Sequence, residues 1–219
     1  MKKLFVLVAC AVLSLGAFAQ NKLSWEVEAG MNLAKMNVTG YDSRVGFHAG
    51  IRGKYELSSL TDGLYANAGA FLSLKGASVD WGDLASSKCN AYYLEVPVHL
   101  GYQYAVNDNF SVFGEFGPYF AYGLFGNTSA SSMDFEDGES TSESHSTFDE
   151  LKRFDFGLGL RVGVEIRQRY TFSVGYDMGL ANIWDKGYWS DDDYDYDEEI
   201  YAPGSVKNRN LTITLGYKF

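Results

Sequence analysis

The chain has 219 residues, of which 46% are hydrophobic and 16% aromatic, with 24 glycines, three prolines and a net charge of −10. We do not expect the chain to bind nucleic acid, because phosphate contacts require clustered Lys and Arg and this chain has an excess of acidic residues. Beyond residue 19 there is no run of ~18 apolar residues, so the sequence predicts no transmembrane helix.

The first nineteen residues have the pattern of a secretory signal peptide. Lys2 and Lys3 form a basic start, residues 4–15 are almost wholly apolar, and Ala17 and Ala19 are the small residues that precede a cleavage site. We therefore expect a cleaved signal peptide at 1–19 and one mature domain at 20–219.

Cys10 offers a different processing route, because residues 7–10 loosely fit a lipoprotein signal. Cleavage there leaves an apolar segment of about six residues, shorter than the ~7 that such segments normally need. With cleavage after Ala19, the mature chain keeps one cysteine, Cys89, and a lone cysteine cannot form an internal disulfide.

Alternation of apolar and polar residues runs through nearly all of the mature sequence, and this period of two predicts β-strands. The clearest case is 152–167, where Phe154, Leu158 and Val162 share one face with other apolar residues, and Asp155, Gly159 and Arg161 share the other. The predicted strands are 23–33, 44–57, 64–75, 91–104, 110–125, 152–167, 170–180 and 208–219.

The connections between these strands alternate in length. The links 58–63, 105–109 and 168–169 are short, whereas the links after the first, third, fifth and seventh strands have about ten to two dozen residues. Short periplasmic turns and long extracellular loops are typical of outer-membrane barrels. The sequence thus predicts an all-β fold, an eight-stranded antiparallel up-and-down transmembrane barrel with both termini at the periplasmic end.

Volume decides which face of the barrel points inward. Eight strands enclose a lumen only just wide enough for side chains, and the apolar face carries too many large residues to fit. The polar face is rich in glycine, which removes side-chain volume, so we expect it to line the lumen. Its glycines are Gly30, Gly46, Gly50, Gly69, Gly101, Gly117, Gly123, Gly157, Gly159, Gly163, Gly175, Gly179 and Gly216.

Acidic and basic residues are equal in number on this polar face. A packed polar interior requires this balance, because charges that are buried away from water are tolerated only when they are paired. The eight bases are Arg44, Arg52, Lys54, Lys75, Arg153, Arg161, Arg167 and Lys218, and the eight acids are Glu26, Glu28, Glu56, Glu95, Glu115, Asp155, Glu165 and Asp177. Aromatic residues at the short-turn ends predict an interfacial girdle in contact with outer-membrane lipid.

The last strand alternates up to a terminal aromatic residue, Phe219. This ending resembles the C-terminal signal that the outer-membrane insertion machinery recognises. We therefore expect Phe219 to direct the chain to that machinery.

Six short blocks, in order along the mature chain, resemble the PorT-like outer-membrane β-barrel family of Bacteroidetes. They are Glu28–Leu33, Val45–Gly50, Leu74–Ala77, Tyr93–Val98, Asp155–Leu158 and Gly175–Leu180. The resemblance implies the same fold in the bacterial outer membrane. Its eponymous member is associated with protein secretion, so a role in export is an implied alternative, with no residue of this chain assigned to it.

Fifteen of the 28 acids lie in two predicted loops, 126–151 and 182–206. A solvated, self-repelling loop is the simple interpretation. The other is binding of a divalent cation such as Ca²⁺, for which carboxylates are the preferred ligands; the candidates are Asp191, Asp193, Asp195 and Asp197. They do not form an EF-hand, because Tyr196 stands where that loop requires glycine.

No catalytic constellation is recognisable, so we expect neither an enzyme nor an organic cofactor. His48 and His99 fall on the lumen face, and satisfied interior histidines are the expected state. Cys89 is expected to be passive. Trp81, Trp184 and Trp189 fall in loops, where they either form a contact surface or pack onto the barrel rim.

The function expected from the sequence is a small closed barrel with a surface-binding, adhesion or envelope-integrity role. The alternative is an accessory component of protein export across the outer membrane. A narrow porin ranks below both because the predicted lumen is filled, and an outer-membrane enzyme ranks below both because no catalytic constellation is recognisable.

Overall fold

The computed structural model describes residues 22–38, 42–80, 85–133, 140–185 and 205–219. Its strands are β1 (Leu23–Met36), β2 (Arg44–Glu56), β3 (Leu64–Asp80), β4 (Ala85–Asn107), β5 (Phe110–Met133), β6 (Ser140–Ser146), β7 (Phe154–Ile166), β8 (Tyr170–Gly179) and β9 (Asn208–Lys218). One short helix, α2 (Thr147–Glu150), lies between β6 and β7. Within the described ranges, no helix is long and apolar enough to cross a membrane.

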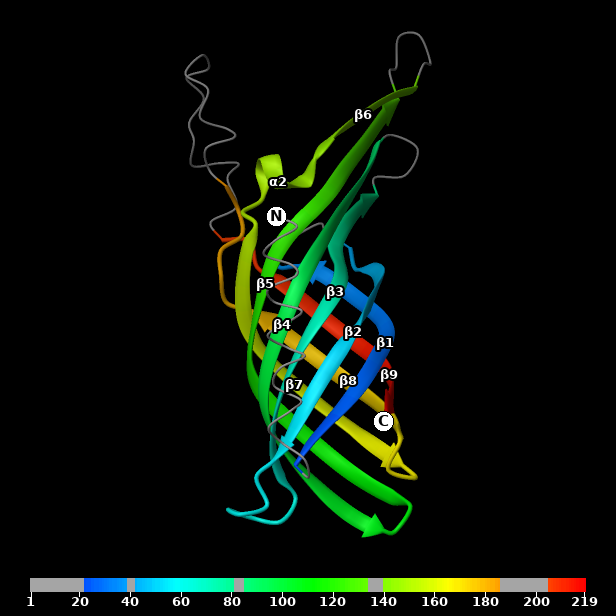
Figure 1. Ribbon diagram of the computed structural model, residues 1–219. Coiled ribbons are helices and arrows are strands. Elements are labelled where there is room, and N and C mark those ends of the chain that lie inside the picture. The colour runs from blue at the N-terminus through cyan, green and yellow to red at the C-terminus, as the bar shows by residue number, and fades with distance from the viewer. Residues whose placement is uncertain (1–21, 39–41, 81–84, 134–139, 186–204) are drawn as a thin grey trace, which may run out of the picture.

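Eight of these strands close into an antiparallel barrel, as the alternation predicts (Figure 1). Neighbours along the wall follow the order β4, β3, β2, β1, β9, β8, β7 and β5, and pairing between β4 and β5 closes the ring. The first and last strands meet in a continuous ladder from Glu26 opposite Lys218 to Met36 opposite Asn208. Closure leaves none of the eight with a free edge along the barrel wall, which a membrane-spanning sheet requires.

The apolar face of the strands forms the outer wall. Large side chains there are exposed, including Met31 (56%), Phe116 (55%), Leu160 (54%) and Leu215 (65%). The lumen holds buried polar and charged residues, among them Glu28, Arg52, Glu115 and Arg161. The predicted orientation of the two faces is therefore confirmed.

Lumen glycines make room for aromatic side chains. A Cβ atom at Gly101 would lie 2.4 Å from Cζ of Tyr65, and one at Gly157 would lie 2.7 Å from Cε1 of Tyr119. Gly114 on the outer wall has nothing within 4 Å of such an atom. Glycine thus fills the role that the volume argument assigns to it.

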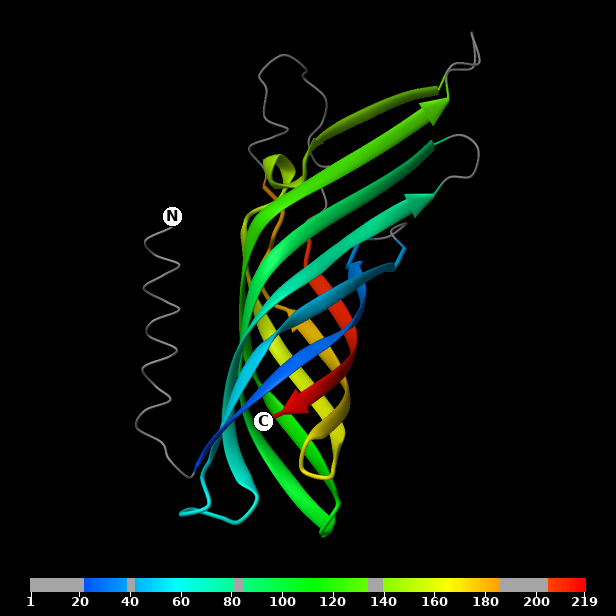
Figure 2. The same ribbon diagram turned by 45° about the vertical axis from the view of Figure 1, so that its right-hand side comes forward.

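Three strands extend well beyond the barrel, and this was not predicted. Residues 76–80 of β3, 85–90 of β4 and 127–133 of β5 pair with one another above the rim, and β6 pairs with β5 there. We call these four segments the protruding sheet; Figure 2 shows it rising to one side of the barrel. The prediction of a loop over 126–151 was wrong for residues 127–133 and 140–146, because backbone pairing makes strands of a stretch with little apolar content. Residues 147–150 form the helix α2.

Candidate functional site

The centre of the lumen is occupied by a network of four charges, Glu28, Arg52, Glu115 and Arg161, which we call the central network. Arg52 on β2 donates to Glu28 on β1, with Nε 2.8 Å from Oε1 and Nη2 3.2 Å from Oε2. Arg161 on β7 places Nη2 2.9 Å from Oε1 of Glu28 and Nη1 3.3 Å from Oε2 of Glu115. Two bases thus balance two acids across opposite walls of the barrel.

Neutral polar groups complete the central network. The hydroxyl of Tyr65 donates to Oε1 of Glu115 at 2.8 Å, and Nε of Arg161 donates to Oγ of Ser173 at 2.8 Å. Nη1 of Arg52 donates to Oδ1 of Asn67 at 2.8 Å. Because charge-assisted hydrogen bonds are shorter and stronger than neutral ones, the network ties β1, β2, β3, β5, β7 and β8 together.

Both lumen histidines lie where the sequence predicts. His48 is held through both ring nitrogens, with Nδ1 2.7 Å from Oδ1 of Asn32 and Nε2 3.0 Å from Oγ1 of Thr214. His99 lies with Nδ1 3.7 Å from Oε2 of Glu115, but its ring nitrogens make no hydrogen bond within the part of the chain that the structure describes. The prediction of a satisfied histidine is confirmed for His48, whereas the carboxylate of Glu115 is the charged neighbour of His99.

A second buried cluster surrounds Lys75, nearer the long-loop end. Lys75 forms an ion pair with Glu95 and places Nζ 4.5 Å from the ring centroid of Tyr119. The hydroxyl of Tyr119 donates to Oδ2 of Asp155 at 3.3 Å, and Nδ2 of Asn208 donates to the same oxygen at 2.9 Å. This cluster packs the interior above the central network.

The predicted eight-to-eight charge balance was wrong in detail. Arg153, Arg167 and Glu56 are exposed at the strand ends rather than buried in the lumen. Arg153 instead donates to the carbonyls of Gly123 and Leu124 on β5. Alternation assigns a side chain to a face, but it does not say where along the strand the closed part of the barrel ends.

The space left in the lumen is small. A cavity of about 40 Å³ lies beside His48 and His99, with Arg52, Arg161, Glu95 and Asp177 also on its walls. One water molecule needs roughly 10–15 Å³ of free space, so this cavity has room for only a few water molecules. Around this cavity, the described part of the lumen is filled by polar and charged side chains.

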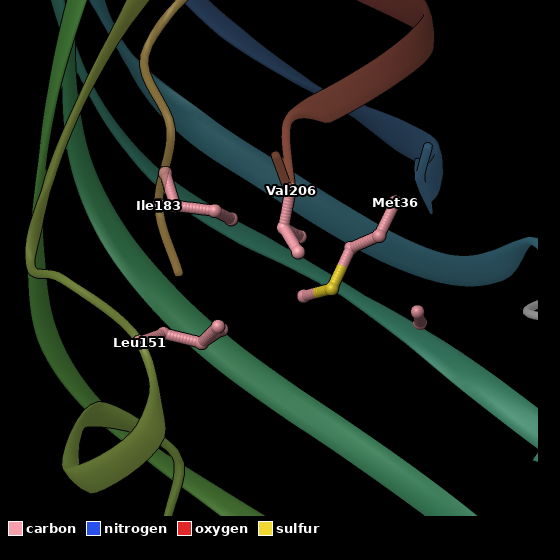
Figure 3. Packing of buried hydrophobic residues seen from close by; sticks show 5 residues of the cluster. Met36, Leu151, Ile183 and Val206 are labelled. Carbon is pink, nitrogen blue, oxygen red and sulfur yellow. The ribbon is translucent and has the colours of Figure 1, made fainter. Parts of the chain in front are cut away.

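A buried apolar cluster, which we call the apolar plug, lies at the long-loop end (Figure 3). It consists of Met36, Ala77, Leu151, Ile183 and Val206, each at most 5% exposed. Backbone hydrogen bonds fix two of its segments, because Ile183 donates to Val206 and Lys152 donates to Ile183. Sequence reasoning missed the plug, since single apolar residues inside polar loops produce no periodic signal.

The structure describes some of the other residues that the sequence analysis considered, and some lie outside the described ranges. Trp184 and Cys89 pack partly buried against the plug, so the rim-packing interpretation of Trp184 is confirmed. Sγ of Cys89 lies 4.0 Å from Oγ1 of Thr147, and its thiol is free. The signal peptide, Trp81, Trp189 and the four aspartates Asp191, Asp193, Asp195 and Asp197 lie outside the described residues.

No group of His, Cys, Asp and Glu placed to hold a metal ion occurs in the described ranges. Besides the lumen, the protruding sheet is a second candidate functional site. β6 pairs with β5 from Asn127 opposite Ser146 to Met133 opposite Ser140. Among the described residues, no strand pairs with the other side of β6.

The family model for the outer membrane protein beta-barrel domain matches residues 18–185. The chain belongs to this family. The matched residues contain all of the barrel strands except β9, and the match and the closed barrel together place the protein in the bacterial outer membrane. The PorT-like resemblance is a finer assignment than this match and stays a prediction.

Several solved outer-membrane proteins align with most of the chain. The chain is 15% identical to Ail, the attachment invasion locus protein of Yersinia pestis, covering 91% of this chain and 100% of that chain with a TM-score of 0.42. It is 12% identical to Neisserial surface protein A of Neisseria (90% and 95% covered, TM-score 0.48) and 15% identical to OprG of Pseudomonas aeruginosa (90% and 95%, TM-score 0.42). No curated protein sequence matches the chain.

Proposed function

We propose that this barrel is a non-enzymatic surface protein that binds an extended segment of another protein along β6. The observation that carries the proposal is the one-sided pairing of β6, which pairs with β5 and, among the described residues, with no other strand. An open strand edge presents backbone N–H and C=O groups to which a partner strand can add.

The position of β6 supports this role. Above the rim, β6 takes the place beside β5 that β7 occupies within the barrel, since β5 pairs with β7 up to Tyr122 and with β6 from Asn127. The protruding sheet is anchored by the barrel below it, so a partner would meet a preformed edge rather than a loop. Preformed sites lose less conformational entropy on binding.

The test uses bacteria that display either the full chain or a variant lacking residues 128–145. We expect cells with the full chain to adhere to immobilised extracellular-matrix protein, and cells with the shortened variant to adhere no better than cells without the barrel. Heat-modifiable gel migration confirms that the variant barrel is folded. Equal adherence of the two kinds of cell contradicts the proposal.

Two proline variants separate strand addition from a general disturbance. Consecutive residues of a strand direct their N–H groups to opposite sides, and proline removes that donor. Of Thr141→Pro and Ser142→Pro, one removes a hydrogen bond to β5 and the other removes an outward donor. We expect the outward variant to lose adherence while its barrel and protruding sheet stay intact.

We further propose that Phe219 is the recognition residue for the outer-membrane insertion machinery. Phe219 is 72% exposed at the end of the last barrel strand, and its backbone N–H donates to the carbonyl of Trp25 at 3.1 Å. A fixed backbone and an exposed ring suit recognition by another protein. Phe219→Ser should slow insertion in vivo, whereas Leu60→Ser, an equally exposed apolar residue in a turn, should not.

An accessory role in protein export is the alternative that the PorT-like resemblance suggests. No contact among the described residues favours it over surface binding. Co-purification of the barrel with a secretion complex would reverse this order.

A further inference from the structure

The cavity beside His48 and His99 has on its wall a carboxylate whose partner is a neutral side chain. Asp177 on β8 lines this cavity. Its Oδ2 accepts a hydrogen bond from Nδ2 of Asn210 on β9 at 3.2 Å. Among the described residues, no Lys or Arg forms an ion pair with Asp177, because the lumen bases pair with other carboxylates.

The other acids around the cavity each have a basic partner. The central network contains two acids and two bases. Glu95, also on the cavity wall, forms an ion pair with Lys75 and so adds one acid and one base. Asp177 is then a fourth acid against three bases.

The rest of the chain has little to offer as a counter-charge. Lys186 is the one base in residues 20–219 that lies outside the described ranges. The described chain that leads to it runs from Asp177 through the buried plug residue Ile183 to Asp185. The backbone N–H of Asp185 donates to the carbonyl of Glu150 in α2 at 3.0 Å, away from the cavity. We therefore expect the balancing charge to come from outside the chain.

The space beside Asp177 is kept open by a glycine. Gly159 on β7 lies directly opposite Asp177 in the ladder with β8. A Cβ atom at Gly159 would lie 3.0 Å from Oδ1 of Asp177 and 2.9 Å from Nε2 of His99. Any larger residue at this position would crowd the carboxylate.

A second oxygen on the cavity wall lacks a partner. Asn210 lines the cavity and is 2% exposed, and its Oδ1 has no hydrogen-bond donor in the ranges that the structure describes. Buried polar atoms are normally satisfied. An amide oxygen without a donor and a carboxylate without a base both attract a positive charge.

We propose that this cavity binds a small monovalent inorganic cation, with Asp177 as its charged ligand. Buried charges in proteins are paired or coordinate metal ions, and hard cations take oxygen ligands. Asn210 and Thr212 provide neutral oxygens on the same wall. One unpaired carboxylate matches a single positive charge, whereas a divalent ion would leave an excess.

The size of the cavity fits the same ligand. Its volume of about 40 Å³ has room for one Na⁺ and one or two water molecules. The site differs from a metal centre built from three or more His, Cys, Asp and Glu side chains, of which the described residues contain none.

The experiment measures urea unfolding of residues 20–219 in zwitterionic phospholipid vesicles, in NaCl or in choline chloride at the same ionic strength and pH. The protein is folded into the vesicles in the salt under test, so the ion need not enter a finished barrel. Choline is too large for the cavity. We expect a higher folded-to-unfolded ratio in NaCl. Well above the dissociation constant, an increase of about tenfold in Na⁺ should raise this ratio by about tenfold.

Two variants and a matched control locate the effect. Asp177→Asn removes the charge with little change of shape and should abolish the difference between the salts. Gly159→Ala keeps the carboxylate but fills the space beside it, so it should reduce the difference. The control is Asp155→Asn. Asp155 also accepts from an asparagine of β9, with Nδ2 of Asn208 at 2.9 Å, but it does not line the cavity, so its variant should keep the full difference.

Equal folded-to-unfolded ratios of the wild type in the two salts overturn the proposal, and mean that a proton on Asp177 or His99 supplies the charge. A loss of the difference in Asp155→Asn as large as in Asp177→Asn also overturns it, because the effect would then not belong to this cavity. If a variant does not fold, the comparison of the two salts with the wild type still decides.

Discussion

Arg52 and Glu28 form a two-pronged ion pair inside the barrel, with both side chains at most 7% exposed. The two residues are not directly opposite each other in the ladder between β1 and β2. Arg52 lies opposite Glu26, and its side chain reaches diagonally to Glu28. The diagonal reach lets Glu28 also accept from Arg161 on the far wall. Through this pair, the interior charges act as cross-braces of the barrel.

Removing one member of this pair should therefore be costly. Arg52→Met leaves part of the charge of Glu28 uncompensated, and we expect a loss of about 3–5 kcal/mol in the free energy of unfolding. The double variant Arg52→Met with Glu28→Leu should lose less than the two single variants added together. Denaturant unfolding in lipid vesicles, followed by tryptophan fluorescence, measures both; a single variant within about 0.5 kcal/mol of wild type contradicts the role given to the pair.

Two glycines on opposite faces provide a matched test of lumen packing. A Cβ atom at Gly157 would lie 2.2 Å from the carbonyl oxygen of Met178 and 2.7 Å from Tyr119. Gly157→Ala should cost about 1–3 kcal/mol, as overpacking does. Gly114→Ala on the outer wall has open space, so it should be neutral within about 0.5 kcal/mol. The same unfolding assay compares them, and equal effects would contradict a crowded interior.

These comparisons show what the sequence predicts well. The alternation of 152–167 placed β7 almost to the residue, because Phe154 to Ile166 obey one rule, apolar side chains out and polar side chains in. The positions of the glycines indicate which face of the sheet is crowded. Each of these signals is repeated many times along the chain, so a single exception does not hide it.

Other features have no repeated signal. The segment Ser140–Ser146 contains no apolar alternation, and only its backbone pairing with β5 makes it a strand. Ile183 and Val206 are single apolar residues whose burial depends on loops meeting over the lumen. The choice of Glu28 rather than Glu26 as partner of Arg52 depends on side-chain reach, which a pattern of faces cannot express.

The filled lumen predicts that the barrel does not conduct ions. Charged pairs cross its centre, the cavity beside His48 and His99 is about 40 Å³, and the apolar plug packs at the long-loop end. In planar-bilayer recordings, the purified protein should give no stable ohmic steps. Regular channel openings would contradict the closed barrel and support the narrow-porin alternative.

Calcium binding by Asp191, Asp193, Asp195 and Asp197 stays a prediction from the sequence. Closely spaced carboxylates suit a hard cation, so isothermal titration of the whole protein with Ca²⁺ should give saturable heats. The variant with all four aspartates changed to asparagine should give none. Flat heats for the wild type at millimolar Ca²⁺ would end the idea.

The central claim is that the apolar face meets lipid while the glycine-rich polar face fills the interior. A cysteine scan along β7 in a Cys89→Ser background, with a nitroxide label on each position in lipid vesicles, tests it most directly. The account predicts that labels at Phe156, Leu160 and Val162 collide with oxygen dissolved in the bilayer, and that labels at Asp155, Gly159 and Arg161 do not. High oxygen collision rates at the second set, or no alternation along the strand, would contradict it.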